Sequence, residues 1–163
     1  MKFSVQAGRF DVARRLYEEG ALRRELRARA AALPPGLDER ITGALARGDG
    51  RAAEDGLMVF FAALIRDLAL EAGRQVSAGG ESAEARAAAG RRFLEAIWRY
   101  YNLVDFAVTQ RDARAATTVR LAFDEAETLV KGPAPERLRE PLERIARALA
   151  GVIEASVQTR RES

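Results

Sequence analysis

The chain has 163 residues, enough for one domain with a sizeable core, and carries 27 basic against 24 acidic side chains. It contains neither Cys nor His, which excludes disulfides, thiolate and imidazole metal ligands, Ser-His-Asp or Cys-His catalysis and phospho-His relays. Because 25 of the 27 basic residues are Arg, the basic excess indicates a GC-rich genome at least as readily as a nucleic-acid ligand.

Apolar residues recur at helical spacing in every periodic segment, and none alternates for long as a strand does. The first helix is expected over about 9–33, with Gly20 bending or dividing it. The residues expected on its buried side are Val12, Leu16, Leu26, Ala30 and Leu33. Pro34-Pro35-Gly36 ends this helix, and a short helix follows that ends at Gly48.

Three residues of the middle of the chain are expected to cap helices. Asp49 precedes a helix over about 50–77, and Ser82 precedes a long helix from about 83. Asp112 can begin a further helix that carries Val119 and Phe123 inward. Because the apolar stripe keeps its phase across 109–113, a single helix over 83–131 is the alternative.

The stretch Gly132-Pro133-Ala134-Pro135 stops one helix and opens the last one, whose true beginning lies nearer residue 140 if Pro141 delays it. The whole pattern predicts a single all-α domain over 1–163. Four long antiparallel helices form a bundle over 49–158, the N-terminal helices of 1–48 pack across it, and 159–163 is a frayed tail.

The most informative segment is 93–108, which holds the only Trp and two of the three Tyr. Its main buried stripe is expected to consist of Ile97, Tyr101, Val104 and Val108. Trp98 and Phe106 lie away from that stripe, so we expect that they are not both sealed in the monomer's own core. The residues predicted to form an interface or a pocket are Trp98, Tyr100, Tyr101, Asp105 and Phe106.

Carboxylates at helical spacing offer a second kind of site. Glu71 lies at the edge of an apolar stripe, so we expect it to be at least half buried and satisfied by an Arg, a Tyr hydroxyl or a cation. Asp124 and Glu127 share a helix face and would complete an all-oxygen site for a divalent cation. The alternative is that Glu71 pairs with Arg74 and that the other two are solvated.

Other chemistry has little support in the sequence. The Arg-rich stretch 23–29 has no aromatic or polar readers beside it and is diluted by acidic residues, so no nucleic-acid partner is expected. Without His or Cys, catalysis would need paired carboxylates or an activated Tyr or Lys, and no catalytic residue is assigned. The chain is therefore expected to be non-catalytic.

Three segments carry a resemblance to known proteins. They are Arg92-Phe93-Leu94-Glu95-Ala96-Ile97-Trp98-Arg99-Tyr100-Tyr101, Arg111-Asp112-Ala113-Arg114-Ala115-Ala116 and Ala122-Phe123-Asp124-Glu125-Ala126-Glu127. Together they resemble extracytoplasmic helical domains that accompany bacterial iron permeases and the imelysin-like family. The resemblance implies a metal-handling accessory domain, but the imelysin signature includes a His that this chain lacks, so that family's metal site is not carried over.

Two functions remain open from the sequence. The first is an interaction protein that docks a protein partner or a second copy of itself through the aromatic helix. The second is a ligand- or metal-binding bundle whose cofactor is a divalent cation held by carboxylates. No apolar run approaches the length of a membrane span. The compartment is expected to be cytoplasmic if Met1 is the native start and extracytoplasmic if a signal peptide was removed.

Overall fold

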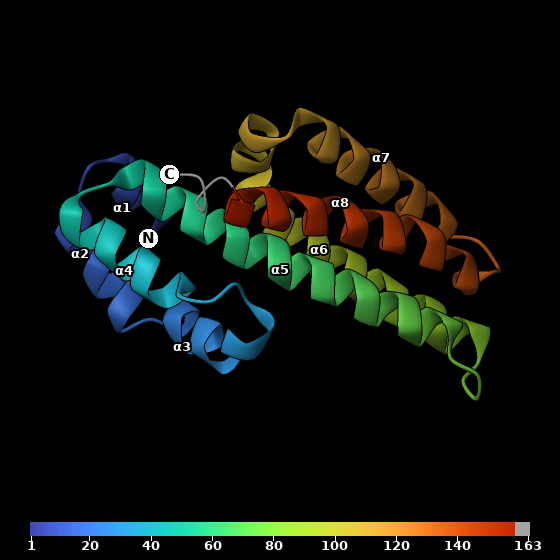
Figure 1. The fold of residues 1–163 in the computed structure, drawn as a ribbon. Coiled ribbons are helices and arrows are strands. Elements are labelled where there is room, and N and C mark those ends of the chain that lie inside the picture. The colour runs from blue at the N-terminus through green and yellow to red at the C-terminus, as the bar shows by residue number, and fades with distance from the viewer. Residues whose placement is uncertain (159–163) are drawn as a thin grey trace. The chain divides into compact units, whose positions relative to one another are not determined.

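The computed structural model describes residues 1–158, apart from the side chain of Lys2, and every regular element in that range is a helix (Figure 1). The predicted all-α fold is confirmed. In chain order the elements are α1 (Lys2–Gln6), α2 (Phe10–Glu18), α3 (Ala21–Ala28), the 3-10 turn η1 (Ala30–Ala32), α4 (Leu37–Arg47), α5 (Gly50–Ser77), α6 (Ala83–Arg111), α7 (Ala113–Leu129), the 3-10 turn η2 (Pro135–Leu138) and α8 (Arg139–Gln158).

The chain divides into two compact units, residues 1–60 and the residues from 61 onward, with the boundary inside α5. The single-domain organisation, and the packing of the N-terminal helices across the bundle, stay predictions. The expected frayed tail at 159–163 lies outside the described residues. Within the described part of the chain, no helix combines the length and the apolar character that a membrane span requires.

In the first unit, α2 turns a different face inward from the one that the sequence predicted. Val12 and Leu16 are 39% and 50% exposed, whereas Ala13 and Tyr17 are fully buried. Gly20 separates α2 from α3, as expected, so the two helices need not share one apolar stripe. The predictions that Val12, Leu16 and Ala30 lie in the core are therefore wrong, whereas Leu26 and Leu33 are buried as expected. In α2 the large ring of Tyr17 takes the inner position.

Tyr17 belongs to a polar network centred on Asp38, in the first turn of α4. The Tyr17 hydroxyl donates to Asp38 Oδ1 at 2.9 Å, and the Nε atoms of Arg23 and Arg27 each lie 2.8 Å from an Asp38 carboxylate oxygen. The Asp38 side chain is only 13% exposed. Three donors thus satisfy one largely buried carboxylate, which ties α2 and α3 to the start of α4.

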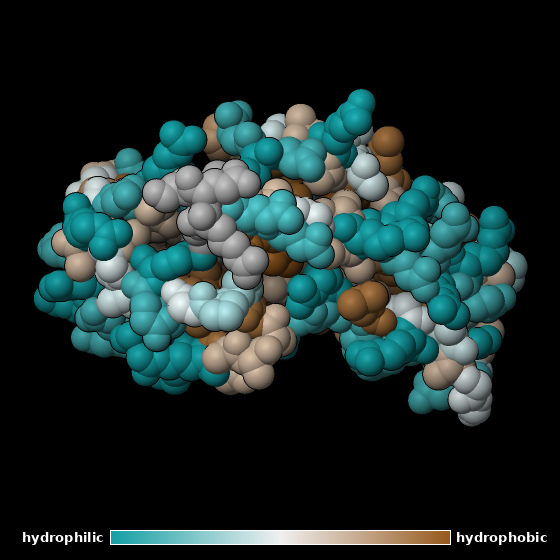
Figure 2. All heavy atoms as spheres, in the orientation of Figure 1, coloured by the Kyte–Doolittle hydropathy of each residue, from teal (hydrophilic) through white to brown (hydrophobic). Residues whose placement is uncertain are grey.

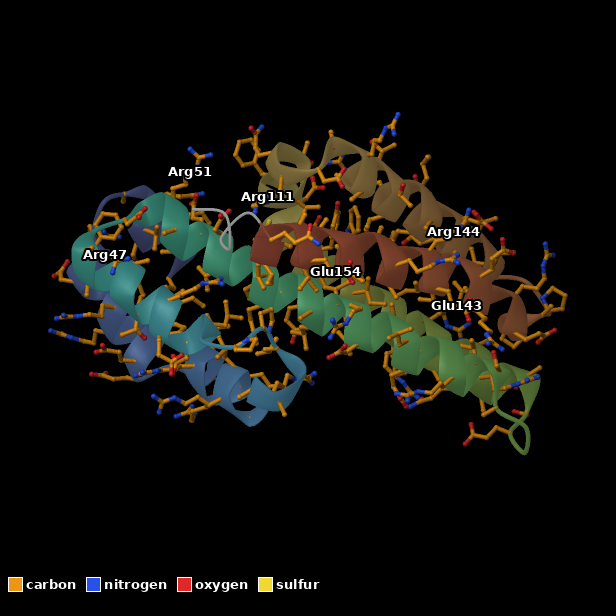
Figure 3. All side chains as sticks on the ribbon, viewed as in Figure 1. Arg47, Arg51, Arg111, Glu143, Arg144 and Glu154 are labelled. Atoms are coloured by element: carbon orange, nitrogen blue, oxygen red, sulfur yellow. The ribbon has the colours of Figure 1, made fainter. Side chains whose placement is uncertain are left out.

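The second unit contains the part of α5 from residue 61 onward and the helices α6, α7 and α8. Their contacts are compatible with the predicted four-helix bundle. Figure 1 shows α7 and α8 side by side, and α7 also packs on α6. Arg144 of α8 reaches toward α7, where it forms an ion pair with Glu125 (Figure 3). At Gly90, a Cβ atom would lie 2.8 Å from Leu138 Cδ1, so this glycine allows a close approach between α6 and η2.

The predicted helix boundaries in this region are confirmed by their caps. The side chains of Asp49, Ser82 and Asp112 accept hydrogen bonds from the backbone N–H groups three residues onward, at 3.0, 3.1 and 2.9 Å. Asp112 has an extended backbone, with φ −151° and ψ 94°. The chain therefore leaves helical geometry at this residue, and 83–131 forms two helices rather than one.

Candidate interaction surface

The helix α6 presents two distinct sides. Its buried stripe is the predicted one, because Ile97, Tyr101, Val104 and Val108 are each no more than 4% exposed. These residues follow one another at three- and four-residue steps, which places them on one face of the helix. Sequence periodicity alone therefore predicted which side of α6 is buried.

Outside this stripe, α6 carries apolar residues in contact with solvent. Trp98 is 39% exposed, Leu103 44% and Phe106 71%. The expectation that Trp98 and Phe106 are not both sealed in the monomer is confirmed. We call Trp98, Asn102, Leu103 and Phe106 the outer face of α6. Leu103 was missed by the sequence reading, although it lies only one turn from Phe106.

Trp98 is fixed on this face by two other rings. Its ring stacks on Phe123 of α7, with centroids 4.6 Å apart and planes inclined by 23°, and on Tyr101 with centroids 6.3 Å apart. Phe123 and Tyr101 are buried. One side of the Trp98 indole therefore packs on buried rings of the bundle while another part faces solvent. The packing restricts the motion of this exposed apolar side chain.

The two tyrosines of the predicted site lie elsewhere. Tyr100 packs against Phe61 of α5 with ring centroids 5.9 Å apart. Tyr101 is 1% exposed, and its hydroxyl lies 3.4 Å from the carbonyl oxygen of Ala116. Burial, together with the nearby Asp105 carboxylate, raises the pKa of the Tyr101 hydroxyl. This phenol stays protonated at neutral pH and belongs to the bundle interior rather than to the outer face.

Asp105 forms a polar edge beside the aromatic residues. Its Oδ1 accepts from the Nε of Arg120 at 3.0 Å and from an Nη of the same side chain at 2.7 Å. The same Nη donates to Thr109 Oγ1 at 2.8 Å. The sequence did not predict that Arg120 pairs with Asp105, because the two residues are 15 positions apart and meet only through the packing of α7 on α6.

The three predicted metal ligands are not brought together. The Glu71 carboxylate accepts from Arg74 and from Gln75, the latter at 2.8 Å, and its side chain is 40% exposed. The hydrogen bonds from Gln75 and Arg74 lower the pKa of Glu71. Asp124 and Glu127 are exposed on α7. Among the described residues, no three acidic side chains are grouped so that they could hold a metal ion. Glu71 thus has an Arg partner, one of the options that the sequence left open.

Over the face of the molecule seen in Figure 2, hydrophilic side chains cover most of the surface and hydrophobic areas are small. Among the described residues, the exposed Phe and Trp side chains are Phe3, Trp98 and Phe106, and two of these three lie on α6. No family model, curated protein or solved structure matches the chain. The resemblance to iron-permease-associated and imelysin-like domains stays a prediction.

Proposed function

We propose that this protein is a non-catalytic helical interaction protein that docks another protein surface through the outer face of α6. The observation that supports the proposal is the exposure of Trp98 and Phe106, at 39% and 71%, on a helix whose other side is fully buried. Aromatic residues are enriched at the centres of protein interfaces, where they supply a large apolar area at a low cost in side-chain entropy.

The local geometry favours binding because part of the surface is ordered in advance. Trp98 is already stacked on Phe123, so a partner that covers it does not need to immobilise a free side chain. Polar pairs lie beside and among the aromatic residues: Glu95 and Arg99 form an exposed ion pair at 2.8 Å, and Asp105 pairs with Arg120.

The chemistry of this face also favours binding over catalysis. Its residues are aromatic, aliphatic and amide side chains, which bind partners but do not take up or release protons near neutral pH. The metal-binding alternative loses support for a separate reason. Glu71 already has Arg74 and Gln75 as partners and is not grouped with Asp124 and Glu127.

Site-specific photo-crosslinking in the cells that naturally make the protein tests this proposal. A benzophenone amino acid placed at Phe106 is expected to give a discrete covalent adduct with one protein, because the ring at this position lies inside the docked interface. The same amino acid at Leu121 is the matched control, since Leu121 is 64% exposed on α7 but lies outside the outer face of α6.

The proposal requires an adduct from position 106 that is absent or much weaker from position 121. Equal adducts from both positions would show that the crosslinker reports exposure alone. Absence of any adduct from position 106, in cells where the variant accumulates normally, would contradict the proposal.

A further inference from the structure

We propose that a shallow groove between α7 and α8 binds the phosphate group of a small phosphorylated molecule through Arg114, Arg144 and Arg147. None of the residues that line this groove belongs to the outer face of α6. The inference therefore goes beyond the proposed function and does not depend on it. It is carried by the charges that line the groove, by an N–H group without an acceptor and by the small residues between the charged ones.

The groove is formed by two helices of the second unit that pack on each other. Arg144 and Arg147 lie three residues apart on α8, so they share a face of that helix, and Arg114 lies in the first turn of α7. The volume of the groove is about 390 Å³, within the range of sites for small molecules. Three guanidinium groups from two helices thus line one groove of suitable size.

The positive charges of this lining are only partly balanced. Arg114 and Arg147 are exposed, and neither forms an ion pair with another described residue. The lining also contains the acidic residue Asp112, whose Oδ1 accepts from the backbone N–H of Ala115 at 2.9 Å and so caps α7. Because the three arginines outnumber this carboxylate, the groove attracts an anion.

Arg144 adds a donor that has no acceptor. One Nη of this side chain pairs with Glu125 of α7, but its Nε is buried and forms no hydrogen bond within the described part of the chain. A buried N–H without an acceptor is costly, and it is one mark of a bound ion or water. An anion that draws the guanidinium toward the groove would provide the missing acceptor.

The number of donors favours a phosphate group over a carboxylate. A phosphate monoester presents three terminal oxygens and about two negative charges at neutral pH, and each oxygen can accept from a guanidinium. A carboxylate has two oxygens and one charge, so it would leave one of the three arginines unmatched. The Thr118 hydroxyl, on the exposed side of α7, also lines the groove and offers a further donor.

Small residues leave room for an organic group beside the phosphate. Ala115, Ala148 and Gly151 also line the groove, and a Cβ atom added at Gly151 would meet no other atom within 4 Å. An apolar surface next to a few charged groups is the usual lining of a small-molecule site. Because the groove is open to solvent, we expect a Kd of about 0.1–1 mM for a small phosphomonoester.

Titration of the isotope-labelled full chain with phenyl phosphate at constant ionic strength, followed by NMR, tests the site. The expected result is a saturable shift of the backbone amide signals of 114–118 and 147–151 and of the Nε–H signal of Arg144. Shifts that spread over the arginines of other helices, or that do not saturate by about 10 mM, would overturn the site.

Arg147→Gln should weaken the binding of phenyl phosphate at least about tenfold, because it removes a guanidinium that has no other partner. Arg147 is exposed, so the variant is expected to fold. Arg92→Gln is the matched control, since Arg92 is exposed on α6 and also forms no ion pair with a described residue. It should change the Kd by less than about twofold. Equal weakening by the two variants would show that net charge alone attracts the ligand, which would overturn the groove as the site.

Benzoate and inorganic phosphate test the two parts of the inferred ligand. Benzoate has the same ring with a carboxylate and should bind at least about tenfold more weakly than phenyl phosphate. Inorganic phosphate should shift the same signals but bind at least about threefold more weakly, because it makes no apolar contact with Ala115 and Ala148. Equal affinity for benzoate would overturn the preference for phosphate. Equal affinity for inorganic phosphate would overturn the organic part of the ligand.

Discussion

Replacement of Asp38 by Ala is expected to lower the free energy of unfolding by about 2–4 kcal/mol, because it leaves three donors without their acceptor. The Tyr17 hydroxyl and the guanidinium groups of Arg23 and Arg27 all meet this one carboxylate. Tyr17 is fully buried and the Arg23 side chain is 21% exposed, so water cannot fully replace the lost bonds. Urea unfolding followed by circular dichroism measures the change.

The same network predicts a dependence of stability on pH. Burial alone raises the pKa of Asp38, but the hydrogen bonds from Arg23, Arg27 and Tyr17 outweigh burial and hold that pKa below its ordinary value. A carboxyl group with a lowered pKa stabilises the fold above its unfolded pKa and loses this contribution as the pH falls through the folded pKa. The parent chain should therefore lose stability below about pH 4 more steeply than Asp38→Asn.

Glu39→Ala is the matched control for Asp38→Ala, because Glu39 is an exposed acidic residue in the same first turn of α4. It should change the free energy of unfolding by less than about 1 kcal/mol, mainly through the helix dipole. Tyr17→Phe removes only one of the three donors and should cost about 1 kcal/mol. Equal effects of Asp38→Ala and Glu39→Ala would show that the network does not stabilise the first unit.

Replacement of Phe123 by Ala is expected to lower the free energy of unfolding by about 3–5 kcal/mol, because a buried ring is removed and a cavity is left. Phe123 is 3% exposed and stacks on Trp98. Loss of this ring should also allow the Trp98 indole more motion and more contact with water. The emission maximum of Trp98 should therefore shift to longer wavelengths in the folded variant. Trp98 is the only tryptophan, so fluorescence reports this site alone.

Leu121→Ala is the control on the same helix, since Leu121 is 64% exposed. It should change the free energy of unfolding by less than about 0.5 kcal/mol and leave the emission maximum of Trp98 unchanged. An unchanged emission in folded Phe123→Ala would mean that the stacking on Phe123 does not hold Trp98 in place.

Most helix boundaries could be predicted because their signals are local. Asp49, Ser82 and Asp112 each cap the helix that follows them, and the residues that form such a cap lie within one turn. The break between α6 and α7 was harder, because apolar periodicity continues across it. There the extended backbone and side-chain cap of Asp112 outweigh the continuity of the stripe.

The parts that could not be predicted depend on contacts between distant residues. The face of α2 is set by Tyr17, whose partner Asp38 lies 21 residues away, and periodicity over nine residues does not reveal that pairing. Arg120 meets Asp105 only when α7 folds back on α6. The outer face of α6 was partly predicted from the sequence, because Trp98 and Phe106 depart from a well-defined buried stripe. The burial of Tyr101 follows from its place in that same stripe.

Acrylamide quenching of Trp98 fluorescence tests most directly whether the outer face of α6 is open to a docked protein. The quenching constant of the folded chain should lie well above that of a sealed indole, because Trp98 is 39% exposed. Phe106→Asp should leave this constant unchanged, since Phe106 lies two turns away along the helix. A quenching constant typical of a sealed indole would contradict the account.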